Sequence, residues 1–243
     1  MSFFQGDQNV ICYVLIHDLI EKNRPIFEGK PIAFDGLTLE AQYKELSPRT
    51  IFLLKEVNAP ERKDDWEFAT HLNYQANPEN DPDHNTTWLY KTWHNVCLWM
   101  ELLERPDATY EKCQKFNEDI LRKKLNYTGV VNIKKTFGAG SSNWDELKKW
   151  AFLEENKKLI RDEIALTEAQ LIICGGTFGL AYDIYNGLFS SVETLPSGAQ
   201  YFVVNNQYFL DFVHPMWFTV KPNILFAYAS VVFKEIKTII DKT

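Results

Sequence analysis

The sequence predicts an α/β protein with three layers, in which helices cover both faces of a central, mainly parallel four-stranded sheet. Short continuous apolar runs, which are typical of strands buried on both faces, alternate along the chain with segments that have apolar residues at helical spacing. Strands that alternate with helices in this way favour a parallel sheet. No internal repeat interrupts the pattern, and we expect residues 1–243 to form a single domain.

The first half of the chain provides one strand signal and three helix signals. Residues 10–21 have apolar side chains at helical spacing, whereas residues 50–54 form a short apolar run and predict the first strand. Residues 72–87 are dense in Asn, Asp and Pro, so they predict a long loop. Helical spacing returns over residues 88–103 and 110–123, which predict the two helices that lead to the second strand.

Two more strands and their helices follow. Residues 129–133 predict the second strand, and the patterns over residues 143–154 and 155–166 predict two helices after it. Residues 170–174 predict a third buried strand, and a helix is expected from Thr177. The chain thus keeps the alternation that a parallel sheet requires.

The last part of the chain completes the sheet. Residues 201–204 and 209–213 predict a fourth strand or a hairpin, and residues 222–240 predict a C-terminal helix with Pro222 in its first turn. Ligands of parallel α/β sheets bind beyond the carboxyl ends of the strands. This rule selects four loops, which are residues 55–62, 132–143, 175–178 and 214–215.

Composition excludes several classes of protein. The chain has no run of about 18 apolar residues, and its first residues lack the cationic and apolar segments of a secretion signal. We therefore expect a cytoplasmic protein without membrane contact. The net charge of −7 has the wrong sign for a protein that holds long stretches of duplex by neutralising phosphates, so any nucleic-acid site must be local.

The four selected loops carry recognisable motifs. Val57-Asn58-Ala59-Pro60-Glu61 follows the first strand, Val130-Val131-Asn132 ends the second, and Phe212-Val213-His214-Pro215 ends the fourth, with a strand-glycine-helix segment over residues 170–178 between them. In this order and spacing, over about residues 50–220, they resemble the motifs of the uracil-DNA glycosylase superfamily. The resemblance implies that family's fold and hydrolysis of the N-glycosidic bond of one pyrimidine flipped out of DNA, which leaves an abasic site. DNA is then the expected partner, with no cofactor, no metal and no obligate protein partner.

The chemistry of base excision asks for the same residue types. Heterolytic cleavage leaves negative charge on the departing base, so a donor at the base oxygen stabilises the transition state, and His214 is the candidate. Asn132 can offer a donor and an acceptor to the edge of a flipped base, and its amide suits uracil or, turned over, a cytosine-like edge. A histidine at a strand end and an asparagine in a turn also have ordinary structural roles, and both interpretations stay open.

The first motif departs from the most active branch of the superfamily, which has an aspartate there to position water. Ala59 stands in that place, as it does in the branch with the motif G-E-A-P-G. The water must then be oriented by another polar side chain, and the candidates are Asn58, Glu61, Asp64 and Asp65. The G-E-A-P-G branch holds an iron–sulfur cluster, but Cys97 and Cys113 precede the middle motif and an N-terminal pair is missing, so we expect no cluster.

Glu61 bears on the choice of substrate. In the strictly uracil-specific branch the residue after the motif proline is a tyrosine that blocks groups at the pyrimidine C5, whereas this chain has Glu61. The resemblance therefore implies a pocket that tolerates a C5 substituent, with Glu61 accepting hydrogen bonds from an amino or sugar hydroxyl group. Glycosylases with this fold act in bacterial antiphage defence on modified cytosines, and a C5-modified cytosine of phage DNA is our refinement of the substrate.

The remaining site predictions concern contact with the base and the DNA backbone. Phe68 and Tyr74 are the aromatic candidates for stacking on a flipped base. Basic, small or amide-bearing residues near the strand ends are expected to contact phosphates. These are Lys134, Lys135, Ser141, Ser142, Asn143 and Gly176.

Three alternatives remain on the sequence alone. A nucleotide-binding protein would explain Gly175-Gly176 after a strand, but no dinucleotide or Walker motif is present. A hydrolase with Cys174 or Ser141 as its nucleophile is disfavoured because neither residue has the setting of an activated group. The strongest alternative is a catalytically inactive DNA- or protein-binding module on the same fold, which Ala59 and the acidic net charge both favour.

Overall fold

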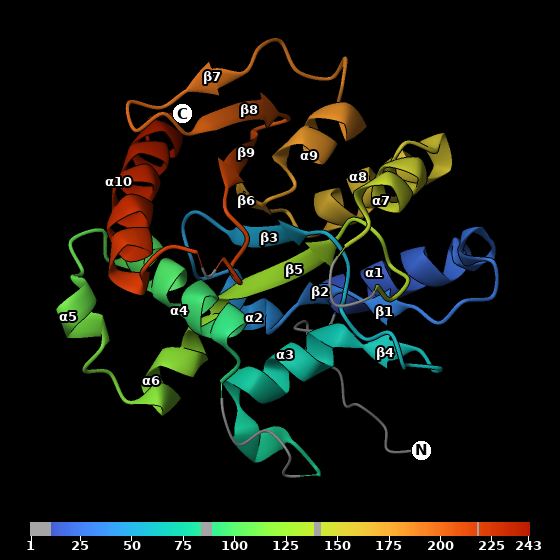
Figure 1. The fold of residues 1–243 in the computed structure, drawn as a ribbon, viewed down its shortest axis with the longest axis horizontal. Helices are drawn as coiled ribbons and strands as arrows, with labels where there is room; N and C mark the ends of the chain where they lie inside the picture. Colours follow the sequence, from blue (N-terminus) through green and yellow to red (C-terminus); the bar gives the residue numbers. More distant parts are fainter. Residues whose placement is uncertain (1–10, 84–88, 139–141, 218) are drawn as a thin grey trace.

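A computed structural model describes residues 11–83, 89–138, 142–217 and 219–243, and these residues form a mixed α/β fold (Figure 1). Within them the main sheet has seven strands, which are β2 (Gly36–Leu37), β3 (Thr50–Leu54), β5 (Thr128–Asn132), β6 (Leu171–Gly175), β7 (Glu193–Thr194), β8 (Gln200–Val204) and β9 (Gln207–Phe212). Their order is β2-β5-β3-β6-β9-β8-β7. A separate parallel pair consists of β1 (Ala33–Phe34) and β4 (Trp66–Glu67).

The four strands expected from the sequence form the parallel core of this sheet. β5, β3, β6 and β9 lie side by side and run in the same direction. The expectation of four strands in total is wrong, because β2, β8 and β7 extend the sheet by antiparallel pairing. β8 and β9 realise the hairpin alternative, and Asn205 and Asn206 both have positive φ in its two-residue turn.

Helices flank the sheet. The described α-helices are α1 (Ile11–Lys22), α2 (Glu40–Tyr43), α3 (Phe68–Ala76), α4 (Lys91–Glu104), α5 (Tyr110–Cys113), α6 (Glu118–Arg122), α7 (Trp144–Ala151), α8 (Glu154–Leu166), α9 (Phe178–Ile184) and α10 (Pro222–Ile240). Short 3₁₀ segments are η2 (Arg24–Phe27), η3 (Pro78–Asn80) and η4 (Lys123–Tyr127). In the described parts of the chain, every helix is too short or too polar to cross a lipid bilayer.

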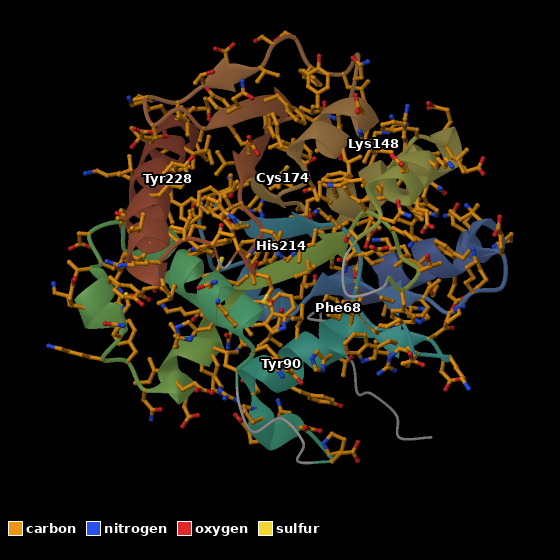
Figure 2. All side chains as sticks on the ribbon, viewed as in Figure 1. Phe68, Tyr90, Lys148, Cys174, His214 and Tyr228 are labelled. Atoms are coloured by element: carbon orange, nitrogen blue, oxygen red, sulfur yellow. The ribbon has the colours of Figure 1, made fainter. Side chains whose placement is uncertain are left out.

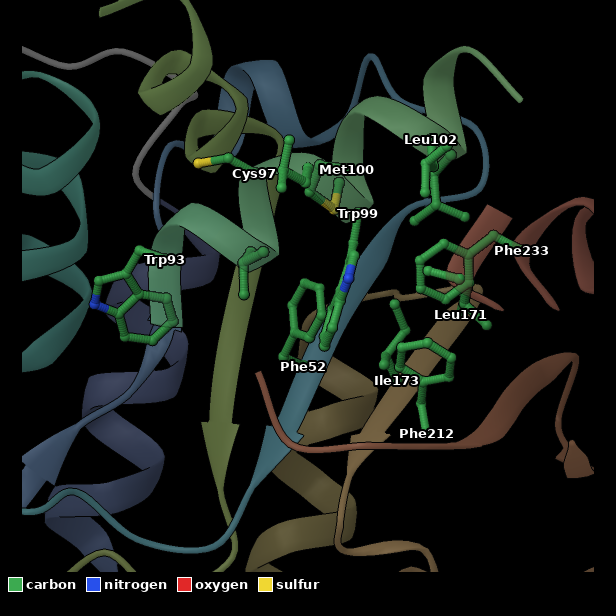
Figure 3. Close-up of a cluster of buried hydrophobic side chains, with 14 of the residues drawn as sticks. Phe52, Trp93, Cys97, Trp99, Met100, Leu102, Leu171, Ile173, Phe212 and Phe233 are labelled. Atoms are coloured by element: carbon green, nitrogen blue, oxygen red, sulfur yellow. The ribbon is translucent and has the colours of Figure 1, made fainter. Parts of the chain in front are cut away.

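Alternation along the strands divides the core into two halves. Phe52 and Leu54 of β3 pack on the side of α3, α4 and α10, whereas Ile51 and Leu53 pack on the side of α1, α7, α8 and α9. On the first side Trp99 of α4 stacks on Phe52, with ring centroids 6.0 Å apart (Figure 3). The parallel strands are therefore buried on both faces, which explains their continuous apolar runs.

Two helix predictions need correction. Residues 72–87 were expected to form a loop, but α3 extends from Phe68 to Ala76 because Phe68, Leu72 and Ala76 recur every four residues and are all buried. The helix ends just before Pro78, as the restriction on residues preceding proline requires. Residues 110–123 do not form one helix, since Asn117 caps the start of α6 by accepting a hydrogen bond from the backbone of Asp119.

Candidate functional site

The loops that follow the parallel strands meet at one edge of the sheet. Lys134 N–H donates to Lys55 O at 2.9 Å and Gly138 N–H donates to Val57 O at 2.9 Å, so the loops after β5 and β3 run side by side. Gly176 N–H donates to Phe212 O at 2.8 Å and ties the loop after β6 to the end of β9. The four segments selected from the sequence thus converge as parallel strands require.

Asn132 and His214 belong to this edge and are linked by a row of residues across the sheet. Asn132 is in register with Leu54 of the neighbouring strand, and strand alternation places both on the α4 side. A Cβ at Gly175 would lie 2.7 Å from Leu54 Cδ2 and 3.7 Å from His214 Cα. Leu54 and Gly175 therefore lie between Asn132 and the backbone of His214 at this edge, and a side chain at position 175 would displace the end of Leu54.

His214 is held in a defined orientation at the end of β9. Met216 N–H donates to His214 Nδ1 at 3.0 Å, and Trp217 N–H donates to His214 O at 2.8 Å. From α4, Asn95 Nδ2 donates to Pro215 O at 2.6 Å and fixes the turn. Figure 2 labels His214 near the centre of the view.

The protonation state of His214 follows from this setting. Burial, together with the smaller effect of the positive charge of Lys55, lowers its pKa from 6.5 to about 4. Because Nδ1 accepts the Met216 N–H, the single proton of the neutral ring is on Nε2. At neutral pH His214 is therefore an uncharged imidazole that offers an Nε2–H donor.

The lowered pKa predicts how stability depends on pH. A histidine that is harder to protonate when folded stabilises the protein fully above pH 6.5, and this contribution is lost as the pH falls towards 4. Between pH 7.5 and pH 5, wild type should therefore lose about 2 kcal/mol more unfolding free energy than His214→Gln, which cannot titrate. Urea denaturation of both proteins at the two pH values measures this difference, and parallel losses would contradict the assignment.

Asn132 lies in a buried polar network. Its Nδ2 donates to Asp35 Oδ1 at 2.7 Å, and its backbone N–H donates to Asp35 Oδ2 at 2.6 Å. Lys135 Nζ donates to Asp35 Oδ2 at 2.6 Å and also forms an ion pair with Glu163 of α8. Burial raises the pKa of Glu163 to about 7 although Lys135 opposes the shift. Asp35, next to β2, thus fixes the end of β5 directly, and Glu163 of α8 pairs with the lysine that binds Asp35.

Lys135 cannot contact DNA in this structure, and that prediction is corrected. Its side chain is fully buried and paired with two carboxylates. Burial alone would lower the pKa of the ammonium group, but Asp35 and Glu163 raise it. The sequence pair Lys134-Lys135 looks like a surface patch, yet the second lysine faces inward because the chain has just left a strand that alternates sides.

The other residues expected to contact DNA differ in exposure. Lys134 is 15% exposed and its Nζ lies 2.6 Å from Glu56 Oε2, so its charge is already paired. Asn143 is exposed, and its side chain accepts hydrogen bonds from the first turn of α7. Ser142 is half-buried, and Gly176 adopts a positive φ of 66° at the turn into α9. Ser141 lies outside the described residues.

The candidates for orienting water lie in the loop after β3. Asn58, Glu61 and Asp64 are exposed, and Asn58 pairs with Gly138 in an isolated parallel bridge. Asp65 has a structural role, because its carboxylate accepts a hydrogen bond from Ile32 N–H and pairs with Arg24. Asp65 is therefore occupied by structural contacts, and Asn58, Glu61 and Asp64 are the exposed candidates that remain.

The two aromatic candidates for stacking do not converge. Phe68 is buried against Trp93 of α4, with ring centroids 5.8 Å apart, and Trp93 is on the same helix as Asn95, which binds the His214 turn. Tyr74 is six residues further along α3, which turns its side chain about 240° around the helix axis from Phe68. Phe68 is thus on the side of the site, whereas Tyr74 faces away from Phe68.

Two residues near the site were missed by the sequence reasoning. Lys55 follows β3 directly, its charge acts on His214, and its Nζ lies 4.5 Å from the ring centroid of Trp144. Its place immediately after a buried strand was a usable signal. Asp35 lies 97 residues before Asn132 and follows a two-residue strand, so no local pattern pointed to it.

A groove of about 580 Å³ opens beside the site. The loops after β3 and β5 line one part of it, and η2 and α7 line the rest; it contains neither His214 nor Asn132. Its cationic side chains are Lys30, Arg62, Lys134 and Lys149, against two carboxylates, Glu28 and Glu146. Lys30 and Lys134 form ion pairs with Glu28 and Glu56, so the charges along the groove largely balance.

Comparison of the chain with protein-family models, with curated proteins and with solved structures finds no match. Among residues 11–83, 89–138, 142–217 and 219–243, no three His, Cys, Asp or Glu side chains come together in a way that could hold a metal ion. The functional assignment therefore depends on the residues of the site themselves.

Proposed function

We propose that this protein is a DNA glycosylase with a uracil-DNA glycosylase-like fold, which hydrolyses the N-glycosidic bond of a pyrimidine flipped out of DNA. The observation that carries the proposal is His214, a half-buried neutral imidazole whose Nε2–H is fixed as a donor. It follows β9 at the same edge of the sheet at which Asn132 ends β5. Four parallel strands with helices on both faces fit the three-layer architecture that the sequence motifs imply.

The geometry suits stabilisation of a departing base. β5 and β9 are separated by two strands, so their axes are about 14 Å apart at an interstrand spacing of about 4.8 Å. Two side chains and a pyrimidine ring can bridge that distance, and we propose that the ring lies over Leu54 and Gly175. A preorganised donor at the base oxygen acts where negative charge develops, and it needs no reorganisation during the reaction.

The reaction can then be written with its atoms balanced. The bond between C1′ and the base nitrogen breaks, and its electron pair leaves with the base, towards His214 Nε2–H and the positive charge of Lys55. Water adds its oxygen to C1′ and loses a proton, which the released base finally takes up. Asn58, Glu61 and Asp64 remain the candidates for orienting this water, because all three are exposed on the loop after β3.

The substrate is refined by the first loop. Glu61 leaves no aromatic side chain directly after the motif proline, which supports a base with a substituent at C5, such as a modified cytosine of phage DNA. The alternative is a catalytically inactive DNA- or protein-binding module on the same fold. It is favoured by Ala59, because an alanine cannot orient water.

A base-release experiment separates the two. We would incubate the protein with uracil-containing DNA and with phage DNA carrying different cytosine modifications, identify any free base by mass spectrometry, and count alkali-labile strand breaks. The proposal predicts one released base and far fewer breaks in His214→Gln over the same time. Binding to the same DNA without released base would support the inactive module, and release of uracil alone would remove the refinement to modified cytosine.

Exposed apolar side chains beside His214 predict a preference that can be tested. Met216 and Trp217 are 41% and 39% exposed, directly after the His214-Pro215 turn. Apolar side chains inserted into a base stack offset the loss of stacking when a base leaves it. Trp217→Ala should therefore lower excision from double-stranded DNA about tenfold, with little change on single strands. Equal losses on both substrates would contradict this role.

A further inference from the structure

The side chain of Asn132 is held by one buried carboxylate. Asp35 lies between β1 and β2, and its two oxygens accept hydrogen bonds from Asn132 Nδ2 and from the Asn132 backbone N–H, at 2.7 and 2.6 Å. Both residues are buried. Asp35 therefore fixes the end of β5 and the amide that this strand end presents.

The acceptor character of Asp35 decides which way the amide is turned. The two ends of an amide are nearly equal in size, but only Nδ2 can donate a hydrogen bond. Next to the carboxylate, Nδ2 lies on the Asp35 side and Oδ1 lies on the other side. If the amide turned over, Oδ1 would face a carboxylate oxygen in a buried setting without a hydrogen bond between them, which is strongly unfavourable.

Lys135 holds Asp35 in this arrangement. Lys135 Nζ donates to Asp35 Oδ2 at 2.6 Å, and it forms its second ion pair with Glu163 from α8. The side chains of all three residues are fully buried. Buried ionic groups of this kind can select one arrangement among several similar ones, even where they add little net stability.

We propose that Asp35 is a positioning residue that sets which pyrimidine edge the site reads, by locking the Asn132 amide in one of its two orientations. The specificity role rests on the glycosylase function proposed above. Uracil-type bases present a donor at N3 and an acceptor at O4, whereas cytosine-type bases present an acceptor at N3 and a donor at N4. An amide fixed in one orientation matches one pattern and opposes the other, and buried polar mismatches of this kind discriminate strongly.

The test compares two carboxylates of the same network. In Asp35→Asn, the new side chain can offer either an oxygen or a nitrogen to Asn132, so the lock is lost. The two substrates are oligonucleotides whose target bases differ only in having a uracil-type or a cytosine-type edge. We expect the ratio of their kcat/KM values to change at least tenfold, so that the preference for one base becomes weaker. Glu163→Gln removes the other partner of Lys135 without touching Asn132, and it should leave the ratio unchanged. A proportional loss on both oligonucleotides in Asp35→Asn would overturn the specificity role.

A second measurement does not need a substrate. In NMR spectra of the free protein, one side-chain amide proton of Asn132 should be shifted downfield and exchange slowly in wild type and in Glu163→Gln, and this signal should be lost in Asp35→Asn. Rapid exchange of both amide protons in wild type would overturn the lock, whatever the activity. A locked signal in a protein that releases no base would instead refute the glycosylase proposal and the specificity role, while the lock itself would stand.

Discussion

Replacing Lys135 with methionine is expected to lower the free energy of unfolding by about 3–5 kcal/mol. Lys135 is the fully buried cation between Asp35 and Glu163, so its loss leaves two buried carboxylates facing one another without a positive charge. Methionine keeps most of the volume, and the loss therefore reports the charge rather than a cavity. Urea denaturation at pH 7.5 provides the measurement.

Two further variants show whether the ion network causes this loss. Lys158→Met removes an exposed ion pair with Asp162 on α8, and it should change the unfolding free energy by less than about 0.5 kcal/mol. Adding Glu163→Gln to Lys135→Met removes one of the two unpaired charges and should recover part of the stability. If Lys135→Met alone were as mild as Lys158→Met, the network would not be the structural support described for β5.

Replacing His214 with glutamine should slow base excision about 10²–10³-fold, which is the effect of removing one preorganised donor from an oxyanion site. Glutamine can still accept the Met216 N–H, so the turn after β9 is kept while the fixed Nε2–H is lost. Single-turnover reactions measure the effect on the chemical step. They use an excess of protein over DNA that contains the base found to be released.

His94→Gln is the matched control for that experiment. His94 on α4 also has a pKa lowered by desolvation, but it is an exposed residue and lines a different cavity, together with Tyr110 and Gln114. Its replacement should leave the rate within about twofold of wild type. A His214→Gln rate equally close to wild type would remove His214 from the chemistry.

The parallel core was predictable because it is buried on both faces. β3 and β6 show continuous apolar runs, β5 and β9 show shorter ones, and the structure places all four strands as expected, to within one or two residues. β2 and β7 are two residues long, so they carry no periodic signal. Their position at the sheet depends on contacts with distant segments.

The sequence predicted which segments meet at the site, but not how their side chains are oriented. Asn132, His214 and the loop after β3 meet because the carboxyl ends of parallel strands share an edge. The buried state of Lys135 was not predictable, because its partner Asp35 lies 100 residues earlier and Glu163 lies on a separate helix. The orientation of the Asn132 amide depends on the same long-range contact, and the tautomer of His214 depends on the turn that follows it.

The most direct test is a structure of the protein bound to DNA that carries the released base on a sugar with fluorine at C2′, which slows cleavage of the glycosidic bond. We predict that the base is turned out of the DNA and lies between Asn132 and His214, with His214 Nε2 within about 3.2 Å of a base oxygen. A base that stays stacked in the DNA, or DNA bound away from the ends of β5 and β9, would contradict the assignment.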